Sequence, residues 1–217
     1  MVGGGRGWRR AAPTATRPTA GTTPAAGCQA APCYLRGVAG PDTLSVLYDA
    51  DAIGEAVRGL AARLTPRLAG KPTYVVPVMN GALFFAADLM RALPREVPVV
   101  GFGVACVASY GAGTAPAGPP EVTAFPARDR LEGRTVLIVD TILDTGATAD
   151  VAVREARARG AADVLFCCLI EKPARRRVPV VPDACAFTAP DLFLVGYGLD
   201  ASGRFRTLPY VAALARA

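Results

Sequence analysis

The stretch Thr135–Thr148, TVLIVDTILDTGAT, decides the expected fold of this chain. Its first six residues form an apolar run that ends in Asp140, which predicts a buried strand with an acidic residue at its carboxyl end. A short loop follows, and a helix is expected to begin at Ala147. Backbone N–H groups at a helix start attract anions, Gly146 permits close approach, and two threonine hydroxyls add donors. The stretch therefore predicts a phosphate site at the end of a strand.

This loop differs from two common phosphate-binding loops. It lacks the GK[ST] ending of a P-loop and the G-x-G-x-x-G pattern of dinucleotide-binding folds. Acidic residues beside an anion site, here Asp140 and Asp144, suggest contacts to sugar hydroxyls, a metal ion, or a proton-accepting role. The alternative is that both are turn or cap residues, which Asp favours through local hydrogen bonds. Residue types alone leave both interpretations open.

Strands and helices are expected to alternate around this stretch. Asp49 or Asp51 can cap a helix that ends at Gly70 and whose apolar residues recur at spacings of three and four. These apolar residues are Ile53, Val57, Leu60, Ala61, Leu64 and Leu68. The other expected elements are a strand at Tyr74–Met79, a helix at Gly81–Leu93, an apolar run at Val97–Ala108, a helix at Ala147–Arg159 and a strand at Asp163–Ile170. The alternation predicts an α/β fold whose parallel sheet binds ligands at the carboxyl ends of its strands.

The chain of 217 residues contains no histidine. This excludes a Ser-His-Asp triad, a Cys-His dyad and an imidazole zinc site, so any proton transfer must use carboxylates, Lys, Tyr or Cys. The formal net charge is +6, but residues 1–41 hold five arginines and no acidic residue, which leaves 19 basic against 18 acidic residues from Asp42 onward. The near-neutral body argues against general nucleic-acid binding.

Residues 1–41 differ in composition from the rest of the chain. They are rich in Gly, Pro, Ala and Thr without a sustained apolar period, which predicts a disordered or wrongly started extension ahead of one domain at residues 42–217. A targeting peptide is the alternative. Four of the six cysteines fall in apolar runs, as buried thiols do, and we expect a reduced, cytoplasmic protein. If they lie in a strand, Cys167 and Cys168 should point to opposite faces. No stretch is long and apolar enough to predict a membrane span.

Three further segments carry recognisable patterns: VMNGALFFAADL at Val78–Leu89, SYGAGT at Ser109–Thr114 and PDLFLVGYGLDASGRFRTLPYV at Pro190–Val211. Together with VLIVDTILDTGAT, and in this order, they resemble the hypoxanthine-guanine phosphoribosyltransferases of the type I phosphoribosyltransferase family. The resemblance implies a central parallel sheet flanked by helices, with a small hood subdomain. It also implies Mg²⁺-assisted transfer of 5-phosphoribosyl from phosphoribosyl pyrophosphate to hypoxanthine or guanine, in a homodimer or homotetramer.

The resemblance also implies roles for individual residues. Asp144 corresponds to the general base near purine N7, Asp140 to a contact of the ribose and the metal, and Asp200 to a magnesium ligand. An ammonium group can only donate, so Lys172 would favour a 6-oxo group over the amino group of adenine. The other implied substrate-binding residues are Thr145, Gly146, Ala147 and Thr148 for the 5′-phosphate, Phe193 and Leu194 for the purine, Arg206, Asn80 and Gly81 for pyrophosphate, and Ser109 and Tyr110 in a closing loop.

Two positions depart from the family pattern. Thr141 stands where a second acidic residue is common, which predicts weaker magnesium-dependent substrate binding, and Asn80 stands where Lys or Arg is frequent. These departures keep open a phosphoribosyltransferase-fold protein that senses a nucleotide without efficient turnover. Retention of Asp144 argues against that alternative, because a sensor needs no general base. A third hypothesis is a nucleic-acid-binding module that uses the arginines of residues 1–41.

Overall fold

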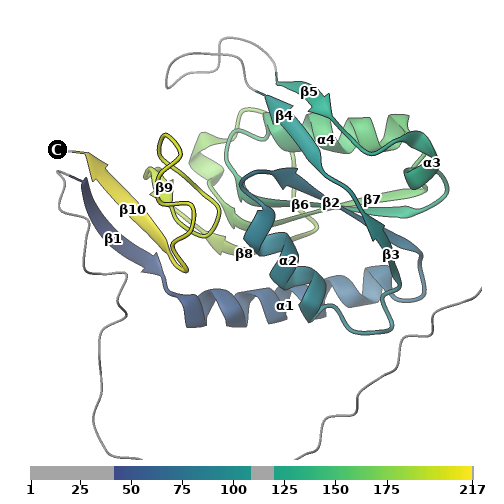
Figure 1. Ribbon diagram of the computed structural model, residues 1–217, viewed down its shortest axis with the longest axis horizontal. Coiled ribbons are helices and arrows are strands. Elements are labelled where there is room, and N and C mark those ends of the chain that lie inside the picture. Colours follow the sequence, from purple (N-terminus) through teal and green to yellow (C-terminus); the bar gives the residue numbers. More distant parts are fainter. Residues whose placement is uncertain (1–41, 109–119, 217) are drawn as a thin grey trace, which may run out of the picture. The chain divides into compact units, whose positions relative to one another are not determined.

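Two sheets organise residues 42–108 and 120–216, the part of the chain that the computed structural model describes (Figure 1). The larger sheet contains β2 (Thr73–Met79), β3 (Val99–Phe102), β4 (Ala105–Ala108), β5 (Glu121–Ala124), β6 (Thr135–Leu143), β7 (Asp163–Glu171) and β8 (Ala184–Thr188). Its order is β5-β4-β2-β6-β7-β8, and β3 also pairs with β2. The smaller sheet, of order β1-β10-β9, contains β1 (Asp42–Tyr48), β9 (Leu194–Val195) and β10 (Val211–Arg216).

Strand β6 lies in the middle of the larger sheet, with β2 and β7 as parallel neighbours. All other pairs of this sheet are parallel too, except β4 with β5. Eight of the nine residues of β6 are buried, as expected for a strand covered by helices on both faces. The predicted parallel sheet is therefore confirmed. The strand runs to Leu143, three residues beyond its predicted end, and so includes Thr141.

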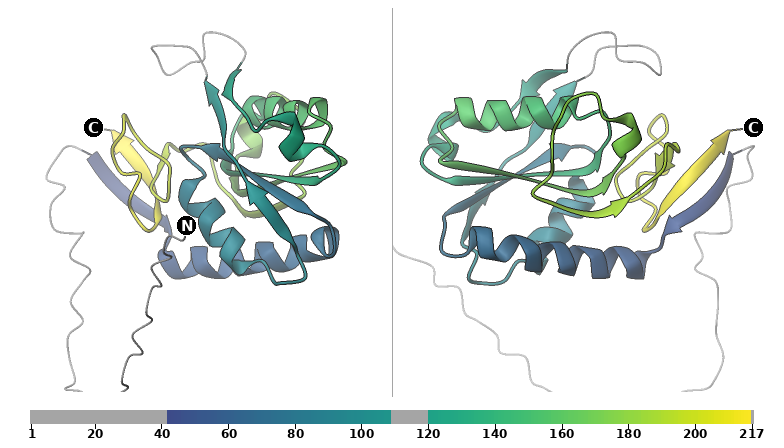
Figure 2. Two further views of the ribbon diagram at one scale, coloured as in Figure 1. Left: turned by 45° about the vertical axis from the view of Figure 1, so that its right-hand side comes forward. Right: turned by 180° about the vertical axis from the view of Figure 1, so that it is seen from behind.

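Helices cover both faces of the larger sheet (Figures 1 and 2). They are α1 (Ala50–Leu68), α2 (Leu83–Ala92), α3 (Arg128–Leu131) and α4 (Ala147–Ala158), and a short 3₁₀ turn, η2 (Pro173–Arg175), follows β7. One core cluster joins α1 and α2 to one face of the sheet, and a second joins α3 and α4 to the other. Cys167 belongs to the first cluster and Cys168 to the second, which confirms that they point to opposite faces.

Helix α1 agrees closely with its sequence pattern. Asp49 is the N-cap, and its carboxylate accepts a hydrogen bond from the Ala52 amide at 2.8 Å. Such caps typically stabilise a helix by about 1 kcal/mol. The six apolar residues predicted from periodicity are the buried residues of the helix. Among the described residues, no helix is long and apolar enough to cross a membrane.

The apolar run Val97–Ala108 forms two short strands, β3 and β4, rather than one. A side chain at Gly103, between them, would come within 2.9 Å of the Tyr74 hydroxyl and 3.0 Å of the Pro126 ring, so a larger residue would require these side chains to move. Strand β3 is exposed despite its composition: Val100 and Phe102 are 52% and 63% accessible. Apolar sequence alone did not show that this strand would lie at an edge.

The smaller sheet joins the two ends of the described chain. β1 pairs antiparallel with β10, so the first and last strands lie side by side (Figure 1). The ring of Tyr48, at the end of β1, stacks on Phe187 of β8 with centroids 4.0 Å apart. This sheet is the second, smaller part of the fold that the resemblance implied, and it carries the loop between β9 and β10 toward the strand ends of the larger sheet.

Candidate active site

The loop between β6 and α4 has the geometry expected of an anion site. Gly146 adopts φ +89° at the N-cap of α4, and a side chain there would meet the Val178 carbonyl at 2.6 Å. Glycine is therefore required for both backbone conformation and space. The Ala147 amide donates to Thr145 Oγ1 at 3.4 Å, and α4 begins at this residue. Amides of the first turn of a helix have no partner within the helix, so a helix start is suited to bind an anion.

A pocket of about 250 Å³ lies at this loop, and we call it the phosphate-side pocket. Among the predicted site residues, it is lined by Gly81, Asp140, Asp144, Thr145, Gly146 and Thr148. Ala147 does not line it. Its other lining residues were not predicted; they are Val78, Met79, Val107, Ile142, Leu143, Ala149 and Leu199.

A second pocket, of about 320 Å³, shares part of its wall with the first, and we call it the purine-side pocket after the ligand that the family resemblance implies for Lys172, Phe193 and Leu194. Its lining includes Asn80, Gly81, Asp144, Lys172, Phe193, Leu194, Asp200 and Arg206. Four residues line both pockets, and Asp144 is the titratable one among Gly81, Ile142, Asp144 and Leu199. Phe193 is 50% exposed, which excludes the alternative that its ring is ordinary core.

Lys172 is a buried cation at the end of β7, with 6% of its surface exposed. Its ammonium group donates to the Leu192 carbonyl, in the segment that leads to Phe193. Burial lowers the pKa of Lys172, while the carboxylates of Asp144 and Asp191 oppose that shift. A buried ammonium group with a carbonyl partner is suited to exchange that partner for a substrate oxygen.

The loop between β9 and β10 contributes an ion pair to the purine-side pocket. Asp200 Oδ1 and Arg206 Nη2 are 2.7 Å apart, and Asp200 Oδ2 accepts from the Gly203 amide at 2.7 Å. Arg206 also donates to the Gly198 carbonyl. Within residues 42–108 and 120–216, no group of three or more His, Cys, Asp or Glu side chains is arranged to hold a metal ion.

The sequence profile of the phosphoribosyl transferase domain family matches residues 44–202. A hypoxanthine-guanine phosphoribosyltransferase of Streptococcus pneumoniae is 36% identical over 80% of this chain and 94% of its own length. The one from Bacillus subtilis is 34% identical over the same shares. The chain belongs to the hypoxanthine-guanine phosphoribosyltransferase family.

Other relatives extend this comparison. The bifunctional protein TilS/HprT of Listeria innocua is 34% identical over 83% of this chain, and the chain spans 28% of the length of that protein. Solved structures of a hypoxanthine-guanine phosphoribosyltransferase from Bacillus anthracis and a hypoxanthine phosphoribosyltransferase from Staphylococcus aureus have TM-scores of 0.71 and 0.70. The first is 26% identical, and the match covers 80% of this chain and 99% of that one. The second is 29% identical, and the match covers 79% of this chain and 91% of that one. The predicted fold class and family are confirmed.

Asp140 and Thr141, the two positions of β6 where the family pattern commonly has two acidic residues, have different surroundings. Asp140 is buried, and burial raises its pKa to about 7, although the amides of Thr141 and Ile142 lower it. Thr141 is fully buried, and its hydroxyl donates to the Gly81 carbonyl at 2.9 Å. A carboxylate at position 141 could make this bond only when protonated. Thr141 therefore has a structural role that the sequence pattern did not indicate.

Two arginines that follow β7 contact the phosphoribosyltransferase loop and were not predicted as site residues. Arg175 Nε donates to Asp144 Oδ1 at 2.8 Å, and Arg176 Nε donates to the Asp144 carbonyl at 3.2 Å. The signal in the sequence is weak, because IEKPARRR could equally be a solvated charged turn. The predicted residues Ser109 and Tyr110 lie outside the described residues.

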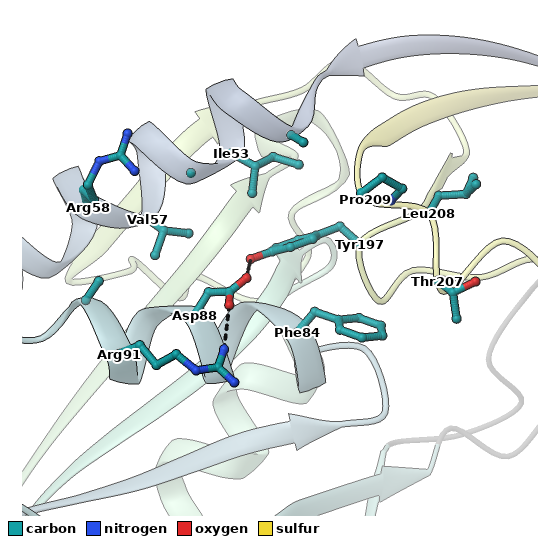
Figure 3. A pocket seen from close by; sticks show the side chains of 13 residues that line it. Ile53, Val57, Arg58, Phe84, Asp88, Arg91, Tyr197, Thr207, Leu208 and Pro209 are labelled. Atoms are coloured by element: carbon teal, nitrogen blue, oxygen red, sulfur yellow. Dashed lines mark hydrogen bonds and ion pairs between the residues drawn. The ribbon is translucent and has the colours of Figure 1, made fainter. Parts of the chain in front are cut away.

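A larger cavity lies away from the phosphoribosyltransferase site, among α1, α2 and residues 207–209 (Figure 3). Its volume is about 650 Å³, and its walls are mainly apolar, with Ile53 and Val57 from α1. The Tyr197 hydroxyl donates to Asp88 Oδ2 at 2.7 Å, and Arg91 donates to Asp88 Oδ1 at 2.8 Å. Its central polar groups are thus paired with one another. None of the predicted site residues lines it.

Proposed function

We propose that this chain transfers the 5-phosphoribosyl group from phosphoribosyl pyrophosphate to hypoxanthine or guanine, giving IMP or GMP and pyrophosphate. The position of Asp144 carries the proposal: it lines both the phosphate-side and the purine-side pocket. The ribose, whose C1′ forms the new bond to purine N9, must lie between the 5′-phosphate in one pocket and the purine in the other. A carboxylate at that junction is suited to accept the proton that the purine loses.

In the proposed reaction, the purine N9 lone pair attacks C1′ while the bond from C1′ to pyrophosphate breaks, and its electron pair leaves with pyrophosphate. Asp144 accepts the proton from N7. The amides at the start of α4, with Thr145 and Thr148, hold the 5′-phosphate. Asp140 contacts the ribose, Asn80 and Gly81 with Arg206 contact pyrophosphate, and Phe193 and Leu194 bind the purine, whose 6-oxo group accepts from Lys172. Ser109 and Tyr110 would close over the site.

Magnesium is the proposed cofactor. Asp200 fits such a role, because Mg²⁺ is commonly held by one or two carboxylates together with substrate phosphates and water. Asp140 lines the phosphate-side pocket, whereas Asp200 lines the purine-side pocket. Asp140 would therefore act as a second carboxylate for magnesium only when a bound substrate connects the two pockets. When bound, the ion would neutralise charge on the pyrophosphate leaving group.

A base panel tests the proposed function. Purified protein with Mg²⁺ and phosphoribosyl pyrophosphate should form nucleotide from hypoxanthine and guanine, and little from adenine. The alternative, a catalytically weak nucleotide sensor, predicts tight binding of phosphoribosyl pyrophosphate or nucleotide with no product from any base. Product from adenine alone would contradict the role of Lys172.

We further propose a cytoplasmic protein whose catalytic domain is residues 42–217, with residues 1–41 as an extension. A variant that lacks residues 1–41 should keep the kcat of the full chain. A large loss of kcat would contradict this division. Salt-dependent RNA binding that disappears with the same deletion would favour the nucleic-acid hypothesis.

A homodimer or homotetramer is the proposed assembly. Strand β3 exposes Val100 and Phe102 and pairs with β2 alone among the described strands. Exposed apolar strands at a sheet edge are commonly covered by another chain. Light scattering should show an oligomer that Phe102→Lys weakens, and a monomeric parent would contradict the proposal.

A further inference from the structure

Arg175 contacts the proposed base although it lines neither pocket. Its Nε donates to Asp144 Oδ1 at 2.8 Å, and its Nη1 lies 3.4 Å from Asp191 Oδ1. Asp144 belongs to the loop after β6, whereas Asp191 precedes the purine-side residues Leu192 and Phe193. One guanidinium group therefore joins the loop that carries the base to the segment that carries the purine contacts.

The short turn η2 explains how Arg175 reaches both carboxylates. Pro173 begins the turn directly after Lys172, and the Arg175 amide donates to the Lys172 carbonyl at 3.1 Å. The Lys172 amide in turn donates to the Leu143 carbonyl at 3.0 Å, beside Asp144. The backbone of this turn is thus hydrogen-bonded to the end of β6. Side-chain bonds from Lys172 to Leu192 and from Arg175 to Asp191 extend the connection to the purine side.

Orientation, rather than stability, is the effect we expect from this contact. The side chains of Asp144 and Arg175 are 37% and 40% exposed, and ion pairs with such exposure contribute little to folding. A guanidinium group is planar and directional, so it can hold a carboxylate in one orientation. Within the described residues, Arg175 takes Oδ1 of Asp144, and no hydrogen bond to Oδ2 is present. Oδ2 remains for a proton from the substrate.

We infer that Arg175 is a positioning residue for the phosphoribosyl transfer. It orients the Asp144 carboxylate and, through its contact with Asp191, holds that carboxylate at a fixed position relative to the bound purine. The inference rests on the proposed function and adds to it a residue that the family resemblance did not assign. Arg175 itself is not expected to contact either substrate.

The first experiment compares Arg175→Gln with Arg177→Gln. Arg177 is a matched control, because it lies two residues away, is exposed, and has no side-chain interaction within the described residues. Arg175→Gln should lower kcat about 10-fold, which is less than the 10²- to 10⁴-fold that a general base contributes. The KM for phosphoribosyl pyrophosphate and the melting temperature should stay near those of the parent, and Arg177→Gln should match the parent throughout.

The second experiment asks whether Arg175 acts through Asp144. In the Asp144→Asn background, Arg175→Gln should cause no further loss of kcat, because residues that act as a unit are not additive. Ethylguanidinium should restore part of the turnover of Arg175→Ala, an effect that a general loss of folding would not show.

The outcomes separate this inference from the proposed function. A parent without turnover on any base overturns both. An active parent with an equally active Arg175→Gln variant overturns the positioning role alone. The positioning role also fails if Arg175→Gln lowers kcat to the same extent with and without Asp144, or if ethylguanidinium gives no rescue where Arg175→Ala is folded and slow.

Discussion

The cavity between α1 and α2 and the two pockets at the end of β6 differ in size and in chemistry. The cavity is about 650 Å³, and three of the polar residues that line it, Tyr197, Asp88 and Arg91, bind one another. The phosphate-side and purine-side pockets are only about 250 and 320 Å³, yet charged groups from several strand ends and loops converge there. The volume of the cavity follows from how two helices and a turn pack. The charged groups that converge on the two pockets are instead what an active site requires.

This difference can be tested by substitution in each region. Changes in the two pockets should lower turnover with little loss of stability, and changes in the cavity wall should do the reverse. The comparison fails if the two sets of variants behave alike.

Asp144→Asn should have the largest effect. Loss of the proton acceptor should lower kcat by about two orders of magnitude or more, while affinity for phosphoribosyl pyrophosphate stays near that of the parent. Steady-state kinetics with hypoxanthine and calorimetric titration would check both. Near-normal turnover would indicate that Asp144 is a turn residue and not the general base.

Lys172→Met should have the next largest effect. A hydrogen bond to a charged group typically contributes about 1.5–3 kcal/mol, so kcat/KM for hypoxanthine should fall by roughly 10- to 100-fold. The KM for phosphoribosyl pyrophosphate serves as the internal control, because the proposed contact of Lys172 is to the 6-oxo group of the purine. Equal losses for both substrates would point to a disturbed loop instead.

Tyr197→Phe tests the cavity wall. It removes the bond to the Asp88 carboxylate, and because a hydrogen bond to a charged group typically contributes about 1.5–3 kcal/mol, it should lower the free energy of unfolding by about that amount, with kcat changed less than two-fold. Chemical denaturation of parent and variant at pH 8 would check the first value. A large loss of kcat would mean that the cavity and the pockets are coupled.

The same variant carries a pH prediction. Burial and the bond to Asp88 raise the pKa of Tyr197 above its ordinary value of 10.0. Below pH 10 the hydroxyl keeps its proton in both the folded and the unfolded chain, so its contribution is fully present. As the pH rises above 10, the unfolded chain ionises first, and the stability advantage of the parent over Tyr197→Phe should shrink. Denaturation at pH 9 and pH 10.5 would measure this change.

Thr141→Val should have the smallest effect. It leaves the Gly81 carbonyl without its hydroxyl donor, which should cost about 1 kcal/mol of stability. Thr141→Ser retains the donor and is the control. If both variants unfold at the same denaturant concentration, the hydroxyl contributes nothing measurable.

Local patterns predicted the elements that are determined by neighbours in sequence. Periodicity and a capping aspartate define α1, and a buried apolar run followed by a Gly-containing loop defines β6 and the start of α4. Family motifs then indicated most residues of the two pockets. All of these signals lie within short stretches of chain.

Features that depend on distant partners were not predictable. β6 continues past Asp140 because Ile142 and Leu143 pair with β7, which brings Thr141 against Gly81. Likewise, the pairing of Arg175 with Asp144 depends on how η2 turns after β7. Such contacts join residues tens of positions apart, and no pattern within either segment encodes them.

The close approach of Gly198 to Gly81 limits how this protein can vary. Gly198 has φ +101°, and a side chain there would lie 1.9 Å from the Gly81 carbonyl, which also accepts from Thr141. A saturation library at position 198 should therefore return only glycine among active clones. Gly203, in the same loop, has open space around it, but its φ of +81° also favours glycine. At position 198 both the backbone conformation and the lack of space exclude a side chain, whereas at position 203 only the backbone conformation does.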